Sequence, residues 1–159
     1  MIDTSVWLEC RIDEELKTAV RHLTEQHELR SSEIVEMEVE AAYGFLRRKR
    51  IEGADVLHEL YLDVKKPVIK ETRAVSGLAE EYASEAGKLG VATASQMKPD
   101  FTIVACAALD NVASILTLNR KTMASDRARL VYSFVNANRK LRTPAFVIGK
   151  EAIKRFAYA

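Results

Sequence analysis

The sequence predicts an α/β domain in which a small parallel β-sheet is covered by helices on both faces. Helical apolar periodicity recurs along most of the 159 residues, and short runs rich in β-branched residues separate the helical segments. This alternation is typical of parallel sheets, because parallel strands are joined by crossover helices. The length fits a single domain over residues 1–159, without internal repeats or long linkers.

The composition excludes several classes of protein. The chain has 24 Lys and Arg against 23 Asp and Glu, so its net charge does not indicate a nucleic-acid or acidic partner. Cys10 and Cys106 match no metal-binding or redox spacing, and two thiols are too few for a disulfide scaffold. The apolar opening 2–8 contains Asp3 and is too short for a signal sequence or a membrane span. We therefore expect a soluble cytoplasmic protein that does not associate with a membrane.

The first residues predict a very short strand that ends at Asp3. The run Asp3-Thr4-Ser5 is equally consistent with the N-cap of a helix, so residues 6–8 are candidates for either a strand or the core. The segment 11–29 then predicts an amphipathic surface helix. Its apolar positions at helical spacing are Ile12, Leu16, Ala19, Val20 and Leu23.

A second helix is predicted after Ser31 and Ser32, which suit its N-terminal cap. One apolar stripe contains Ile34, Glu38, Ala41 and Phe45, and the adjoining stripe contains Val35, Val39, Ala42 and Leu46. Glu38 is the only charged residue on these stripes, and a carboxylate there is costly unless it is paired, protonated or bound to a cation. Glu38 is therefore a functional candidate, with a buried salt bridge as the alternative.

The stretch 98–121 carries the strongest signals. Pro99 suits the first turn of a helix, and Asp100 lies where the positive helix end favours a carboxylate. Steps of three and four residues from Asp100 lead to Ile103, Val104, Ala107 and Ala108. Because these positions form one apolar stripe, we expect Asp100 to face the interior.

The apolar run 112–118 predicts a buried strand after a tight turn. Asn119 follows directly, and open α/β sheets usually bind ligands beyond the carboxyl ends of their strands. Arg120 and Lys121 come next, and they are equally consistent with phosphate contacts and with an exposed loop.

The remaining segments complete the alternation of helices and strands. We predict helices over 54–64, 72–88, 122–141 and 150–158, short strands over 68–69 and 146–148, and a loop over 91–97. In the helix 122–141, one apolar face contains Leu130, Phe134 and Ala137, with Val131 and Val135 beside it.

Three carboxylates from distant parts of the chain, Asp3, Glu38 and Asp100, are predicted to converge. Like charges a few ångströms apart raise each other's pKa values, and a hard divalent cation that prefers oxygen ligands removes this penalty. We therefore expect Mg²⁺ or Mn²⁺ at this site. The sequence has no Ser/His/Asp or Cys/His arrangement and no Gly-rich phosphate loop, so metal-assisted phosphodiester hydrolysis is the reaction that fits best.

Along nearly its whole length the sequence resembles the PIN-domain family of metal-dependent ribonucleases, which includes VapC-like toxins of toxin–antitoxin pairs. Residues 2–6 are similar to the first strand with its metal-binding acid and supporting hydroxyls, 38–39 to the second acidic position and 99–107 to the third. The strand 116–118 leads to the fourth position, usually Asp in the family and here Asn119. Glu36 and Glu40 are the alternatives to Glu38 if the register differs.

The resemblance implies an α/β/α fold and an endoribonuclease whose metal is held by Asp3, Glu38 and Asp100, with Asn119 as a further catalytic position. An amide can ligate Mg²⁺ through its oxygen but has no charge to anchor a second cation, so we expect one firmly held metal. Asp126 is the alternative source of the missing charge.

The resemblance also implies an RNA substrate, a separately encoded antitoxin as partner, and a two-fold homodimer. The alternative, which Asn119 favours, is a PIN-like domain that binds RNA or another protein without cutting. A phosphatase with an aspartyl nucleophile is disfavoured, because such an enzyme needs a second Asp where Ser5 stands.

Overall fold

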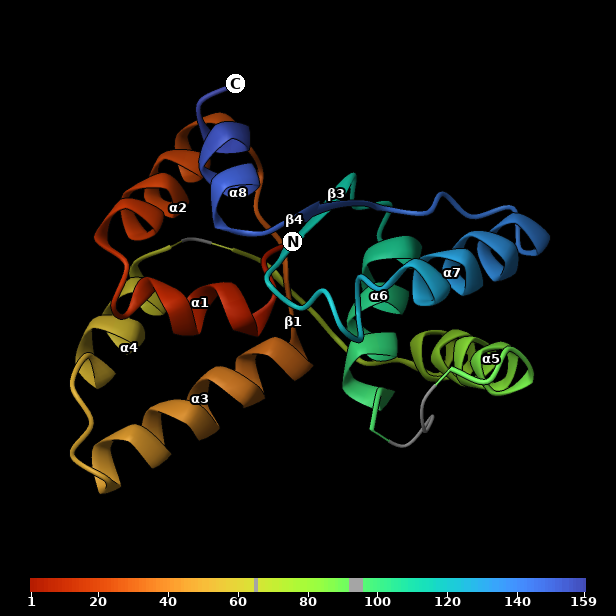
Figure 1. Cartoon of the computed structure of the whole chain (residues 1–159), viewed down its shortest axis with the longest axis horizontal. Helices are drawn as coiled ribbons and strands as arrows, with labels where there is room; N and C mark the ends of the chain where they lie inside the picture. The colour runs from red at the N-terminus through yellow and green to blue at the C-terminus, as the bar shows by residue number, and fades with distance from the viewer. Residues whose placement is uncertain (65, 92–95) are drawn as a thin grey trace.

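The computed structural model describes residues 1–64, 66–91 and 96–159, and it confirms the predicted fold class (Figure 1). Helices alternate with short parallel strands along the chain. In order, the elements are α1 (Thr4–Cys10), α2 (Glu14–Gln26), β1 (Ser31–Ser32), α3 (Glu33–Arg48), α4 (Ala54–Asp63), β2 (Val68–Ile69), α5 (Arg73–Lys88), α6 (Lys98–Leu109), β3 (Ser114–Thr117), α7 (Asp126–Asn138), β4 (Ala145–Ile148) and α8 (Lys150–Ala157).

The strands pair in parallel and place the N-terminus beside β3. β3 pairs with β4 from Ser114 opposite Ala145 onward, and β1 pairs separately with β2. On the other side of β3, Ile2 forms a parallel bridge to Leu116, and the backbone N–H of Asp3 donates to the carbonyl of Leu116 at 2.9 Å. Because the pairing is parallel, Asp3 reaches the same edge as the carboxyl end of β3.

Helices cover the strands from two sides (Figure 1). α5 packs against α6 and α7 on one side, whereas α1, α3 and α4 pack together on the other, and α2 packs against α8. Every residue of α6 from Phe101 to Ala108 is buried, and none of these residues is charged. A helix that is apolar all round belongs in the interior, so α6 is a rigid support for Asp100 in its first turn.

Asp3 both ends the first extended segment and begins a helix, so the strand alternative for residues 6–8 is wrong. Asp3 has an extended backbone (φ −73°, ψ 153°), and the N–H of Val6 already donates to the Asp3 carbonyl at 3.0 Å. Val6 and Trp7 are buried as core residues of α1. The helix therefore starts immediately after the metal-site candidate and fixes its backbone.

Several predicted helix boundaries and faces need correction. The helix predicted over 11–29, which is α2 in the structure, begins at Glu14 rather than residue 11, because the Asp13 side chain accepts the N–H of Leu16 at 2.9 Å as an N-cap. Ile12 therefore precedes the helix and is 64% exposed instead of contributing to its apolar stripe.

Only one of the two predicted apolar stripes of α3 is buried. Val35, Val39 and Leu46 lie in the core, whereas Phe45 on the other stripe is 50% exposed. Glu38 belongs to this second stripe and is half-buried at its edge. The helical periodicity correctly placed Glu38 on a stripe that faces the core side of α3. It did not show that this stripe is only partly buried.

The helix predicted over 122–141 is shorter, because Ser125 caps α7 and residues 122–124 form a turn. Its buried face contains Val131 and Val135. The predicted face of Leu130, Phe134 and Ala137 is exposed. α7 packs against α5, where Tyr82 contacts the buried Tyr132 and Asn136 of α7. The other apolar face therefore remains on the surface of the described chain.

The other predicted elements are confirmed with small shifts at their ends. The predicted loop 91–97 includes residues 92–95, which lie outside the described residues. Both cysteines are buried as free thiols. Within the described parts of the chain, the helices are too short or too polar to cross a lipid bilayer.

Candidate active site

Asp3 is held at the edge of the sheet by two hydroxyl groups. Its Oδ2 accepts a hydrogen bond from Ser5 Oγ at 2.5 Å and another from Thr117 Oγ1 at 2.7 Å. Thr117 is the last residue of β3 and is fully buried, whereas Ser5 lies in the first turn of α1. The Asp3 carboxylate is therefore fixed by the two segments that the Ile2 bridge brings together.

Glu38 reaches the same region from α3. Its Oε2 accepts a hydrogen bond from the hydroxyl of Thr4, the residue that follows Asp3. Burial raises the pKa of Glu38, the Thr4 hydrogen bond lowers it, and the charge of Asp3 raises it further. Thr4 thus connects the first two acids that the sequence predicts.

Asp100 extends from the first turn of α6. Its Oδ2 accepts hydrogen bonds from Thr122 Oγ1 at 2.5 Å and from Asn119 Nδ2 at 3.4 Å. Burial raises the pKa of Asp100 to about 6; the Thr122 hydrogen bond opposes this increase, and the charges of Asp3 and Glu38 add to it. The three acids therefore lie within electrostatic reach of one another.

Asn119 faces Asp100 with its amide nitrogen. Its Oδ1 accepts the backbone N–H of Thr122 at 3.1 Å, and because a backbone N–H can only donate, this contact distinguishes the amide oxygen from the nitrogen. The nitrogen is then the atom that donates to Asp100. In this arrangement Asn119 is a hydrogen-bond donor to an acid and not an oxygen ligand.

The residues that the sequence analysis missed are Thr117 and Thr122. Thr117 accepts the N–H of Asn119 at 2.9 Å while it donates to Asp3, and the N–H of Leu118 donates to Ser5 Oγ at 3.0 Å. The available signal was their spacing, since Thr117 lies two positions before Asn119 and Thr122 lies three positions after it. An Asn side chain often accepts a hydrogen bond from the backbone of a following turn, which brings such neighbours close to it.

The candidates beyond Asn119 are on the surface. Arg120 and Lys121, which directly follow Asn119, are exposed. Asp126 does not supply the missing charge, because its side chain is 91% exposed and pairs with Arg129. Asp126 is the first residue of α7, capped by Ser125, and this places it outside the acid cluster.

The donor set suits a hard divalent cation. Among residues 1–64, 66–91 and 96–159, no three His, Cys, Asp or Glu side chains are close enough to ligate one ion together. Mg²⁺, however, keeps several waters and is usually bound directly by only one or two carboxylates, and all the donors here are oxygens. Burial is the main cause of the raised pKa values of Glu38 and Asp100, with a smaller contribution from the neighbouring acids, and a bound cation would favour the charged carboxylates against both.

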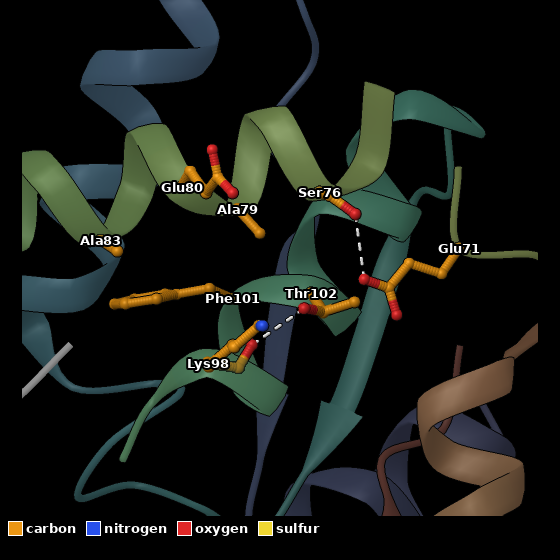
Figure 2. Close-up of a pocket in the computed structure, with 8 residues that line it drawn as sticks. All are labelled: Glu71, Ser76, Ala79, Glu80, Ala83, Lys98, Phe101 and Thr102. Atoms are coloured by element: carbon orange, nitrogen blue, oxygen red, sulfur yellow. Dashed lines mark hydrogen bonds between the residues drawn. The ribbon is translucent and has the colours of Figure 1, made fainter. Parts of the chain in front are cut away.

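A separate pocket of about 300 Å³ lies between α5 and the start of α6 (Figure 2). Glu71, Glu80 and Lys98 contribute its charged groups, and Phe101 contributes apolar surface. Asp3, Glu38 and Asp100 do not line it. This pocket is therefore distinct from the acidic site.

Comparison with known proteins identifies the family to which this fold belongs. Residues 1–128 match the family model of the PIN domain, so the chain belongs to the PIN domain family. PIN domains are generally nucleases, which supports a hydrolase.

A solved structure and the curated proteins were also compared. One similar chain occurs in the crystal structure of VapBC2 from Rickettsia felis bound to a DNA fragment from their promoter, with a TM-score of 0.64 and 14% identity. The match covers 94% of this chain and 97% of that chain, and at this identity it demonstrates the shared fold. A search of curated protein sequences found no match.

Replacing Asp100 should change how the stability of the metal-free protein depends on pH. The folded-state pKa of about 6 lies above the reference value of 3.8, so the folded state binds the proton more tightly and loses stability as pH rises from about 4 through 6. Asp100→Asn, which can still accept the Thr122 hydrogen bond, should therefore melt at a higher temperature than the wild type at pH 7.5 but not at pH 4. Thermal unfolding in EDTA measures this. Asp126→Asn is the control with an exposed carboxylate, and equal pH slopes for Asp100→Asn and the wild type would contradict the account.

Proposed function

We propose that this protein is a divalent-metal-dependent endoribonuclease. The observation that carries the proposal is that Asp3, Glu38 and Asp100 come from three distant segments, lie within electrostatic reach of one another and each accept a hydrogen bond from a hydroxyl group. Membership of a family of nucleases supports hydrolysis, and the oxygen-only donor set supports Mg²⁺ or Mn²⁺. The assignment of RNA as substrate follows the resemblance to PIN-domain ribonucleases.

In the proposed reaction, different residues would bind the ion, orient its ligands and contact the RNA. Asp3, Glu38 and Asp100 would hold the cation, one or two of them directly and the rest through its waters. The hydroxyls of Thr4, Ser5, Thr117 and Thr122 would orient these three carboxylates. When bound, a divalent ion activates water for in-line attack on a phosphodiester and stabilises the charge that develops on the phosphate. Arg120 and Lys121, exposed next to Asn119, would contact the phosphates of the RNA strand.

The second candidate function is a PIN-like domain that binds RNA or a protein without cutting. The observation that favours it is the neutral Asn119, whose amide oxygen bonds to Thr122 instead of facing the acids. Such a site offers less charge to a cation than one with a fourth carboxylate. The two functions differ in whether the wild type binds a divalent ion and cleaves.

Binding of Mn²⁺ to matched variants separates these functions. Mn²⁺ should bind the wild type and raise its melting temperature, with about 2.7 kcal/mol of stabilisation when the free ion is at 100 times its Kd. Asp3→Asn and Glu38→Gln should lose both binding and cleavage of single-stranded RNA. Glu36→Gln is the control, because Glu36 lies on the same helix as Glu38 but is exposed.

Calorimetry measures the binding of the ion, and RNA cleavage assays measure the activity of each variant. Absence of Mn²⁺ and Mg²⁺ binding to the wild type, together with no cleavage across varied RNA substrates, would leave the non-cutting function as the better account.

We further propose that the protein acts with protein partners, namely a second copy of itself and a separately encoded antitoxin. The matched R. felis structure is a complex, VapBC2, and the resembled family commonly forms two-fold dimers, which are also the commonest oligomers. The exposed apolar face of α7, with Leu130 at 65% and Phe134 at 57% exposure, is compatible with a surface that a partner covers.

Light scattering of the purified chain tests the homodimer. Two copies should give a mass of about twice 17.8 kDa at micromolar concentration. A mass of one chain under these conditions would contradict the homodimer without affecting the proposed reaction.

A further inference from the structure

We propose that Thr122 is a positioning residue that determines which oxygen of Asp100 is presented to the divalent ion. The inference rests on the proposed function and extends it to a residue outside the acid set. Thr122 Oγ1 donates to Asp100 Oδ2 at 2.5 Å, and Asn119 Nδ2 donates to the same oxygen. Within the described residues, Oδ1 of Asp100 receives no hydrogen bond from a side chain or the backbone, so Oδ1 is the oxygen left to ligate the ion.

Asp100 needs such a restraint because of its place in α6. It is the third residue of the helix, where a carboxylate commonly turns back toward the unpaired backbone N–H groups of the helix start. The N-cap residue Met97 contributes no side-chain hydrogen bond that would occupy this end. The Thr122 hydroxyl instead holds the Asp100 side chain toward Asn119, which follows the carboxyl end of β3.

Thr122 is itself fixed by the turn that contains it. Its N–H donates to Asn119 Oδ1 at 3.1 Å, and its carbonyl accepts the N–H of Ser125 at 3.2 Å. The N–H of Ala124 also donates to the carbonyl of Asn119 at 3.0 Å. Because the backbone makes these bonds, a change of the Thr122 side chain removes the contact to Asp100 and leaves the turn intact.

The same turn connects Asp100 to Asp3. The Thr117 hydroxyl donates to Asp3 Oδ2 at 2.7 Å. The same hydroxyl accepts the backbone N–H of Asn119, two residues later in the chain, at 2.9 Å. The segment 117–122 therefore holds one acid at each end. Thr117 donates a hydrogen bond to Asp3, and Thr122 donates one to Asp100. Loss of the Thr122 hydroxyl should therefore weaken ion binding without displacing Asp3.

Calorimetric titration of the full chain with Mn²⁺ tests the inference. Thr122→Val, which keeps the side-chain shape but lacks the hydroxyl, should weaken Mn²⁺ binding about 10- to 100-fold, the usual effect of losing a hydrogen bond to a metal ligand. Thr122→Ser, which restores the hydroxyl, should bind within a few fold of the wild type. Thr122→Ala provides a second hydroxyl-free variant if Thr122→Val does not fold.

The matched control is Thr102→Val. Thr102 lies two residues from Asp100 on the same helix, but its hydroxyl donates to the carbonyl of Lys98 at 2.9 Å and not to an acid (Figure 2). This variant should bind Mn²⁺ as the wild type does. At saturating Mn²⁺, the RNA cleavage rate of Thr122→Val should return close to that of the wild type, because the hydroxyl affects ion affinity and not the reaction itself.

The outcomes separate this inference from the proposed function. Wild-type affinity in folded Thr122→Val or Thr122→Ala would overturn the inference alone, and so would an equal loss of affinity in Thr102→Val. Absence of Mn²⁺ binding to the wild type would instead overturn the proposed function on which the inference rests.

Discussion

The convergence of Asp3, Glu38 and Asp100 at one edge of the sheet is the constraint on which the hydroxyl contacts of this site depend. Burial raises the pKa values of Glu38 and Asp100, and the charges of the neighbouring acids, Asp3 for Glu38 and both Asp3 and Glu38 for Asp100, raise them further. Each carboxylate accepts a hydrogen bond from at least one hydroxyl, and hydrogen bonds to a charged group are stronger than those between neutral groups. These donors orient the acids but do not neutralise them, so the site is suited to a cation.

The fold provides the geometry with very little sheet. Ile2 contributes a bridge of one residue, and this bridge brings Asp3 to the carboxyl end of β3 before α1 begins. On the other side of β3, β4 extends the sheet with residues 145–148, which lie beyond the family match over 1–128. The buried helix α6 then holds Asp100 from the interior. Short strands suffice because the helices around them supply most of the core.

Much of this arrangement could be predicted from the sequence, and the limits have physical causes. The helical spacing after Asp100 predicted its inward position because the period of a helix is a local property. Periodicity also selected Glu38, but it could not show that Phe45 and Leu130 remain exposed, since exposure depends on which neighbour packs there. The contacts of Thr117 and Thr122 join residues far apart in sequence, so they became visible only in the folded chain.

The central claim is that these three acids form one cation site, and a crystal structure with Mn²⁺ tests it most directly. Anomalous scattering should place one ion between Asp3, Glu38 and Asp100, with directly ligating oxygens, including Oδ1 of Asp100, at about 2.0–2.2 Å, close to the distances typical of Mg²⁺. The remaining ligands should be waters. An ion bound elsewhere, or no anomalous peak at this site in crystals saturated with Mn²⁺, would contradict the account.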